Sequence, residues 1–287
     1  MVDGIERLMR VQVAVDQQFW LTLPELSQLL DLEPEKISPQ GFSWRNFYCA
    51  PVPHAPGFWS ITRPQSPPPP LPRITRQVST SPEPGSLPSQ FACIDDFLPA
   101  ELVKELLDLT LQEQPHFVPT GVTTKEQNYR QSLFLPNFAQ MPLCSKILDH
   151  IQRVMPEVMG ILGIPNFRIA EIEAQLTAHN HGNYYKVHND NGSPPTATRV
   201  FTYVYYFHRD PKGFEGGELR IFDTKIENNY YVGARSSTLV EPAHNRIVFF
   251  LSRYLHEVLE VRCPSGQFAD SRFTVNGWIR SQSRLAV

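Results

Sequence analysis

The stretch SRFTVNGWIR, residues 271–280, carries the pattern that decides the fold, because its polar and apolar side chains alternate. Successive side chains on a β-strand point to opposite faces of the sheet. One face would hold Arg272, Thr274, Asn276 and Trp278, and the other Phe273, Val275, Gly277 and Ile279. An arginine inside a protein is costly unless it meets an anion, and its planar fork suits a carboxylate. The stretch therefore predicts a strand between an apolar core and a polar cavity.

The same two-residue period appears upstream, where Ala170, Ile172, Ala174 and Leu176 alternate with Glu171, Glu173 and Gln175. Apolar runs bounded by Gly, Pro, Asn and Asp predict further strands at residues 199–208, 218–222, 246–251, 256–261 and 272–280. Two amphipathic helices are predicted before them, at residues 97–112 and 141–155. Helices followed by strands indicate an α+β domain, with the strands folded as a double-sheet barrel or jelly roll.

A proline-rich stretch divides the chain. Nine of the 27 prolines lie between Pro64 and Pro88, and consecutive prolines favour an extended path that acts as a semi-rigid spacer. We therefore expect a small module at residues 1–62, a linker at 63–90 and the main domain at 91–287. In the module, VQVAV at residues 11–15 is β-rich, and Thr22 is placed to cap a helix. We expect the module to be a packing or protein-recognition unit.

Composition narrows the possible partners. The 287 residues are 41% hydrophobic and carry a net charge of −3. These values predict a folded protein and argue against nucleic acid or an anionic membrane as a partner. The strongest apolar run, residues 247–251, is far shorter than the ~20 residues of a membrane-spanning helix. The four cysteines are scattered without zinc-type or disulfide spacing, which favours the cytoplasm.

The motif YYKVHNDNG, residues 184–192, holds the densest cluster of chemically active side chains. His188 and Asp190 are two residues apart, so they project to one side of an extended chain. His256, after the buried run RIVFFLS, supplies a third candidate ligand. Two imidazoles and one carboxylate leave part of a metal open, as in non-haem iron(II) oxygenases. Zinc hydrolases use the same ligand types, so these three residues alone leave both metals open.

Arg272 favours the oxygenase over the hydrolase. A zinc hydrolase needs a positioned general base beside the metal, and it has no use for a buried arginine that faces the metal. An anion held by Arg272 would also meet the hydroxyl of Thr274 on the same strand face. Tyr206, in the segment RVFTYVYYFHRD, is expected on an opposing strand and would supply a phenolic donor.

The order His188-x-Asp190, His256, Arg272 resembles that of the 2-oxoglutarate- and iron(II)-dependent dioxygenases. The closer resemblance is to the prolyl 4-hydroxylase-like branch, which includes the hypoxia-factor prolyl hydroxylases. The segments that carry it are YKVHND, TYVYYFH, GFEGGELRIFD, NRIVFFLSRYLHEV and SRFTVNGWI. The resemblance covers roughly residues 91–287 and implies a double-stranded β-helix with helices outside the larger sheet.

The resemblance also implies the cofactors and the reaction. Iron(II) would be held by His188, Asp190 and His256. Arg272 would pair with the C5 carboxylate of 2-oxoglutarate, assisted by Tyr206 and Thr274. Oxygen would be the oxidant and ascorbate the reductant that maintains the iron. The implied activity is hydroxylation of an unactivated C–H bond, with a peptidyl residue, proline favoured, or an amino acid as the substrate.

Some features depart from the family pattern. Ala178 stands where the family often has a further co-substrate tyrosine, so the second co-substrate contact is unassigned. His179 and His181 fall in a Gly/Asn-rich segment and are expected in an exposed loop, with a role on the substrate side of the metal as the alternative. Two other functions stay open alongside the dioxygenase: a zinc hydrolase, and a non-catalytic barrel that serves as a binding module.

Overall fold

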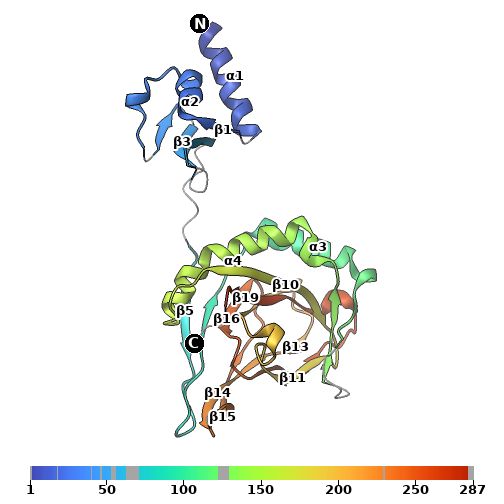
Figure 1. Cartoon of the computed structure of the whole chain (residues 1–287). Helices are drawn as coiled ribbons and strands as arrows, with labels where there is room; N and C mark the ends of the chain where they lie inside the picture. The colour runs from blue at the N-terminus through green and yellow to red at the C-terminus, as the bar shows by residue number, and fades with distance from the viewer. Residues whose placement is uncertain are drawn as a thin grey trace. The chain divides into compact units, whose positions relative to one another are not determined.

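The computed structural model describes residues 2–17, 19–39, 41–45, 47–52, 56–62, 71–121, 129–228 and 230–283. The chain divides into two compact units, residues 1–70 and 71–287. Each unit has a hydrophobic core of its own, and Figure 1 shows both. The boundary falls inside the predicted linker.

The first unit contains two helices and a small antiparallel sheet. The helices are α1 (Val2–Asp16) and α2 (Leu23–Leu30). The sheet has the order β1-β4-β3-β2, formed by Trp20–Thr22, Phe58–Thr62, Phe47–Pro51 and Phe42–Trp44. Thr22 is the N-cap residue of α2, as expected, and its backbone N–H donates to the carboxylate of Glu25 at 2.7 Å.

Residues 11–15, a β-rich run in the sequence, form part of helix α1 instead. Val11 and Ala14 are buried, and Val15 packs against the same core. Their spacing of three and four residues places them on one helical face, which contacts α2 and β4. Burial of that face outweighs the β propensity of valine.

The second unit is built on two antiparallel sheets that face each other across a cavity, so the predicted jelly roll is confirmed. The larger sheet has the order β5-β6-β16-β12-β19-β10-β9-β7. Its strands are Ile74–Val78, Gln90–Ile94, Arg246–Leu251, Arg199–Phe207, Arg272–Ser281, Ile169–His179, Leu133–Leu135 and Val118–Pro119. The predicted strands at 199–208, 246–251 and 272–280 therefore agree with the structure to within a residue at each end.

The smaller sheet has the order β15-β14-β17-β11-β8. Its strands are Tyr230–Val240, Leu219–Glu227, His256–Val258, Tyr184–His188 and Arg130–Gln131. The strand predicted at residues 256–261 is divided, because β18 (Val261–Arg262) leaves this sheet to pair with β13 (Glu215–Gly216). Strand β15 was not predicted.

Two helices, α3 (Ala100–Gln112) and α4 (Pro142–Ile161), lie against the outer face of the larger sheet (Figure 1). Helix α4 extends beyond the predicted end at residue 155 and includes Pro156. Phe273, Val275 and Ile279 are fully buried in the core beneath these helices. The apolar face of residues 271–280 thus lies where the sequence predicted. No helix among the described residues is long and apolar enough to cross a membrane.

The downstream half of the expected linker belongs to the second unit. Strand β5 pairs with β6, and Leu87 exchanges backbone hydrogen bonds with Thr224 in β14. The buried carboxylate of Asp223 accepts hydrogen bonds from the Ser79 hydroxyl at 2.9 Å and the Ser89 backbone N–H at 2.8 Å. The segment ITRQV at residues 74–78 contains no proline, which leaves it free to join the sheet.

We expect residues 71–287 to fold without the first unit, and a protein that begins at Ser89 to be less stable. The shorter protein loses β5 and the hydrogen bond from Ser79 to buried Asp223. Asp223 keeps its hydrogen bonds from Ser236 and Ser89. Loss of the one charge-assisted hydrogen bond from Ser79 costs about 1.5–3 kcal/mol, which lowers the melting temperature by at least about 2–4 °C in a domain of this size. Thermal unfolding followed by circular dichroism tests this, and equal melting temperatures would contradict it.

Candidate active site

The inner face of the larger sheet arranges polar side chains in rows. Strand β19 pairs with β10 on one side and β12 on the other, and residues opposite each other point to the same face. From one end of the strands to the other, the rows are His179 with Arg272; Thr177, Thr274 and Tyr206; Gln175, Asn276 and Val204; and Glu173, Trp278 and Thr202. Tyr206 therefore lies on the strand beside β19, not on an opposing strand as expected.

The side chains of His188, Asp190 and His256 meet in one cluster. Their candidate ligand atoms all lie within 4.8 Å of one another. Asp190 places Oδ1 3.7 Å from Nε2 of His188 and Oδ2 3.3 Å from Nε2 of His256. The pairing of β11 with β17 sets the two histidines opposite each other. The structure thus brings together the three candidate ligands that lie apart in the sequence.

Backbone carbonyls orient both imidazole rings. Nδ1 of His188 is 2.7 Å from the carbonyl oxygen of Lys186, and Nδ1 of His256 is 2.9 Å from that of Tyr254. A carbonyl only accepts, so each Nδ1 carries the proton and each Nε2 presents its lone pair to the cluster. Burial, together with the adjacent His256 ring, lowers the pKa of His188 to about 3. His188 is therefore in the neutral form that binds metals.

A hydrogen bond from strand β12 holds the carboxylate of Asp190 in place. The hydroxyl of Thr202 donates to Oδ2 at 2.7 Å and lies 3.0 Å from the hydroxyl of Ser252. The backbone N–H of Asp190 donates to the carbonyl of Ser252 at 2.9 Å. Burial opposes ionisation of this carboxyl, but its interactions with His256 and His188 together outweigh burial and lower the pKa of Asp190. The carboxylate is thus fixed and ionised.

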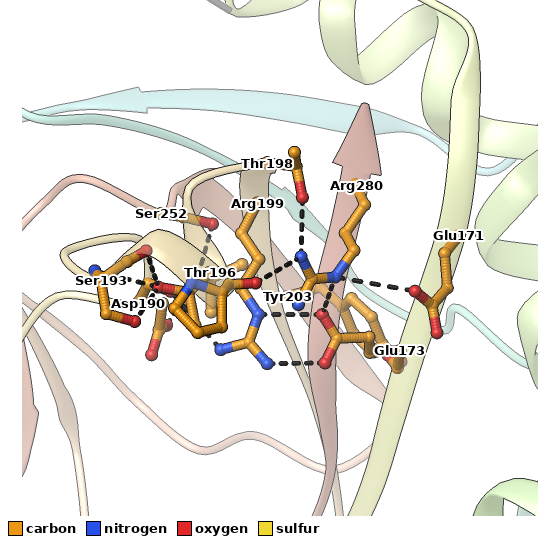
Figure 2. A network of polar contacts seen from close by, with 12 residues as sticks. Glu171, Glu173, Asp190, Ser193, Thr196, Thr198, Arg199, Tyr203, Ser252 and Arg280 are labelled. Carbon is orange, nitrogen blue, oxygen red and sulfur yellow. Dashed lines mark hydrogen bonds and ion pairs between the residues drawn. The ribbon is translucent and has the colours of Figure 1, made fainter. Parts of the chain in front are cut away.

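A network of ion pairs, shown in Figure 2, supports one wall of the cavity, which Arg199 and Trp278 line. Arg199 binds Glu173 with both Nε and a terminal nitrogen, at 2.9 and 2.6 Å, and Glu173 also pairs with Arg280. The guanidinium of Arg199 lies over the Trp278 ring, 3.5 Å from its centroid. These contacts link strands β10, β12 and β19. The charges of Arg199 and Arg280 are balanced by ion pairs with Glu173.

Arg272 has no such protein partner. It is 2% exposed, and two of its nitrogens have no hydrogen-bond partner among the described residues; the same holds for the hydroxyl of Tyr206. The Arg272 guanidinium lies 5.0 Å from the centroid of the Tyr206 ring. Gly217, at φ +69°, makes room for it, because a Cβ there would come within 2.7 Å of the Arg272 side chain. Thr274 instead shares its hydroxyl with Thr177 at 2.6 Å.

His179 lines the cavity, a position that the sequence analysis gave only as the alternative to an exposed loop. We expected it in an exposed loop, but it is 3% exposed at the end of β10, beside Arg272. Neither ring nitrogen has a hydrogen-bond partner among the described residues. Burial, reinforced by the charge of Arg272, holds its pKa well below the ordinary range. Ala178, in contrast, faces the core on the other side of the sheet. The alternation of β10, extended through residue 179, would have revealed this placement.

A single cavity of about 410 Å³ connects these groups. One part of its lining is the metal-type cluster, formed by His188, Asp190 and His256. The rest includes Arg272, Thr274 and His179, and the wall formed by Arg199 and Trp278. Asp190 is the only carboxylate among its described lining residues. The cavity thus combines a three-ligand cluster with a buried cation whose hydrogen bonds are unfilled.

The comparisons with known proteins agree with this geometry. The family model of the 2OG-Fe(II) oxygenase superfamily matches residues 174–280. A curated relative, an uncharacterized PKHD-type hydroxylase from Synechocystis sp., is 44% identical over 196 residues, which cover 68% of this chain and 65% of the relative. The matched region thus spans slightly less than two thirds of that relative's length.

Solved structures show the same fold. A prolyl-4-hydroxylase from Pseudomonas putida superposes with a TM-score of 0.50 at 22% identity, covering 67% of this chain and 93% of the other. The non-heme alpha ketoglutarate dependent epimerase SnoN from nogalamycin biosynthesis gives a TM-score of 0.50 at 12% identity, covering 67% and 78%. Together, the family match and the relative place residues 174–280 of this chain in the 2OG-Fe(II) oxygenase superfamily, and the solved structures show the same fold in the second unit.

Proposed function

We propose that the chain is an iron(II)- and 2-oxoglutarate-dependent hydroxylase. The observation that carries the proposal is the pairing, in one cavity, of a two-histidine, one-carboxylate cluster with a buried arginine that forms no ion pair among the described residues. Such a ligand set leaves part of the metal open to other molecules. The arginine supplies the anion-binding group that a dicarboxylate co-substrate requires.

The three candidate ligands fit iron(II). His188 and His256 would bind through Nε2, because their Nδ1 atoms face backbone carbonyls. Asp190 would bind through an oxygen that Thr202 already orients. Iron with oxygen and 2-oxoglutarate would supply the oxidising power for C–H hydroxylation, with succinate and carbon dioxide as the by-products. The protein contributes the position of the ligands and the exclusion of water from the cavity.

Arg272 would hold the distal carboxylate of 2-oxoglutarate, and the unpartnered hydroxyl of Tyr206 would donate to the same group. Thr274 would assist, since its hydroxyl belongs to the neighbouring row. We add His179 to this set, because its neutral ring lies beside Arg272 and can donate one N–H to a carboxylate. We therefore propose His179 as the second co-substrate contact, the role that the family pattern would give to the position of Ala178.

The lining of the cavity weakens the zinc-hydrolase alternative. A metal hydrolase needs a general base beside the metal-bound water. Apart from Asp190, the described lining residues include no carboxylate. His179 lies at the Arg272 end of the sheet, in a row with that arginine.

We propose the class of prime substrate from the similarity of this fold to solved structures. A solved protein of the same fold is a prolyl-4-hydroxylase, and another is an epimerase, so the fold permits more than one reaction. We favour a peptidyl residue, proline first, with a free amino acid as the alternative. Ascorbate is proposed as the reductant that maintains the iron, and the first unit as a site for protein recognition.

Replacing His188, Asp190 or His256 with alanine should abolish iron binding and succinate formation, because each change removes one of three protein ligands. Iron content is measured after anaerobic loading with Fe(II), and succinate is measured in air with 2-oxoglutarate and ascorbate. His116→Ala, an exposed histidine paired with Glu113, is the control and should behave like wild type. A triad variant that retains both iron and turnover would show that the ligand assignment is wrong.

Replacing Arg272 with glutamine should weaken 2-oxoglutarate binding by on the order of 2–5 kcal/mol, because a buried carboxylate loses its charged partner. Iron loading should be unchanged. Calorimetry with Mn(II) in place of iron measures the affinity without turnover, and Arg262→Gln, an exposed arginine, is the matched control. Equal affinities in the Arg272 variant and wild type would remove this residue from the co-substrate site.

The metal-free protein should lose stability as the pH falls from about 6.5 towards 3. Unfolded His188 takes up a proton near its ordinary pKa of 6.5, whereas folded His188 does so only near its lowered pKa of about 3. The unfolded state therefore binds more protons in this range. His188→Gln should lose about 1–2 kcal/mol less than wild type between pH 7 and 5. Urea unfolding at both pH values tests this, and equal losses would contradict it.

A further inference from the structure

A second arginine, Arg130, reaches the cavity from the smaller sheet. It lies on β8, opposite Tyr185 on β11, and it lines the same cavity as Arg272. Its guanidinium lies 4.7 Å from the centroid of the Tyr185 ring. That ring stacks in turn on His188, with centroids 3.6 Å apart. Arg130, Tyr185 and His188 therefore form one continuous stack that ends at the metal-type cluster.

Among the described residues, no carboxylate lies within ion-pair distance of Arg130, although the charge of Asp190 acts on it from farther away. The Nε of Arg130 donates to the Ser132 hydroxyl at 2.9 Å. Arg199, in the same cavity, is paired with Glu173 at 2.6 Å. Burial lowers the pKa of Arg130 from its ordinary value, yet a guanidinium stays charged at physiological pH. A partly buried charge without a counter-charge is unfavourable unless an anion joins it.

A charge balance shows which anion is missing. On the proposed function, on which this step rests, Asp190 and the two carboxylates of 2-oxoglutarate carry three negative charges. Iron(II) and Arg272 carry three positive charges, and the wall around Arg199 is compensated within the protein. Arg130 is then the one cation of the described cavity lining that still lacks a counter-charge.

We propose that Arg130 binds a carboxylate of the prime substrate and places it against the Tyr185 face of the metal site. The planar fork of arginine suits a carboxylate, which it can bind with two parallel hydrogen bonds. The substrate is thus a carboxylate-bearing molecule, and not a neutral internal peptide segment. The carboxylate belongs to an acidic side chain, to a peptide C-terminus or to a free amino acid.

The test uses the full chain loaded with Mn(II) and saturating 2-oxoglutarate, so that no turnover occurs. Paramagnetic Mn(II) accelerates the relaxation of nearby protons, and NMR therefore reports which small probes approach the metal. The first probe is acetate, with neutral acetamide as its isostere. In wild type, acetate should show enhanced relaxation and acetamide should show none, a comparison that needs no variant.

The variants assign the effect to Arg130. Arg130→Gln should reduce the acetate enhancement at least about tenfold, the factor that corresponds to a loss of 1.4 kcal/mol. Arg130→Lys, which keeps the charge, should retain part of it, and Arg262→Gln should behave as wild type. Three matched pairs then distinguish the sources of the carboxylate: N-acetyl-Pro-Asp-amide with its Asn analogue, Gly-Pro with its amide, and L-proline with prolinamide.

Several results would overturn the proposal. They are equal enhancement by acetate and acetamide, no enhancement by any carboxylate probe, and an acetate signal unchanged in Arg130→Gln. Arg130 would belong to the co-substrate site instead if its glutamine variant lost 2-oxoglutarate affinity as severely as Arg272→Gln. Failure of wild type to bind Mn(II) and 2-oxoglutarate at all would overturn the proposed function itself, and calorimetry before the NMR experiment separates that outcome from the others.

Discussion

Strand β19 lies between β10 and β12, and its register decides which side chains reach the cavity. A slip by one residue would turn Arg272 into the apolar core and Phe273 into the cavity. Gly277 helps to fix the register, because a Cβ there would meet the Glu173 carbonyl oxygen at 1.8 Å. Tyr203 occupies the same crossing and donates to that carbonyl at 2.8 Å. The close approach of β19 to β10 at Gly277, together with the Tyr203 hydroxyl, therefore helps to hold the register that brings Arg272 to the cavity.

The polar groups of the site fall into two classes. Asp190, Arg199 and Glu173 are bound to protein partners, and they form rigid walls that do not depend on a ligand. Arg272 and His179 are buried with unfilled hydrogen bonds, which costs stability in the empty protein. Such unfilled groups are retained where a ligand completes them. The polar groups that already have protein partners thus form the scaffold of the site, and the buried groups without partners form the surface that would bind a ligand.

The strands whose apolar and polar residues follow a regular pattern could be predicted from the sequence. Strand β16 has the predicted bounds, and the two faces of β19 hold the predicted residues, because each side chain there is either in a core or in a cavity. Residues 11–15 were not predictable from β propensity, since a tertiary core selects the helical face. Arg130 lies on a two-residue strand, too short to show a period. Its place beside Tyr185 depends on strand pairing between distant segments, which a single sequence does not record.

The central claim is that one cavity holds the metal and the co-substrate together, and calorimetry tests it most directly. 2-Oxoglutarate is titrated anaerobically into the metal-free protein and into the protein loaded with Fe(II). The account predicts one site per chain and an affinity at least about tenfold higher with iron, a coupling of about 1.4 kcal/mol, because the cluster and Arg272 would then hold opposite ends of one molecule. Equal affinity with and without iron, or no binding in either case, would contradict it.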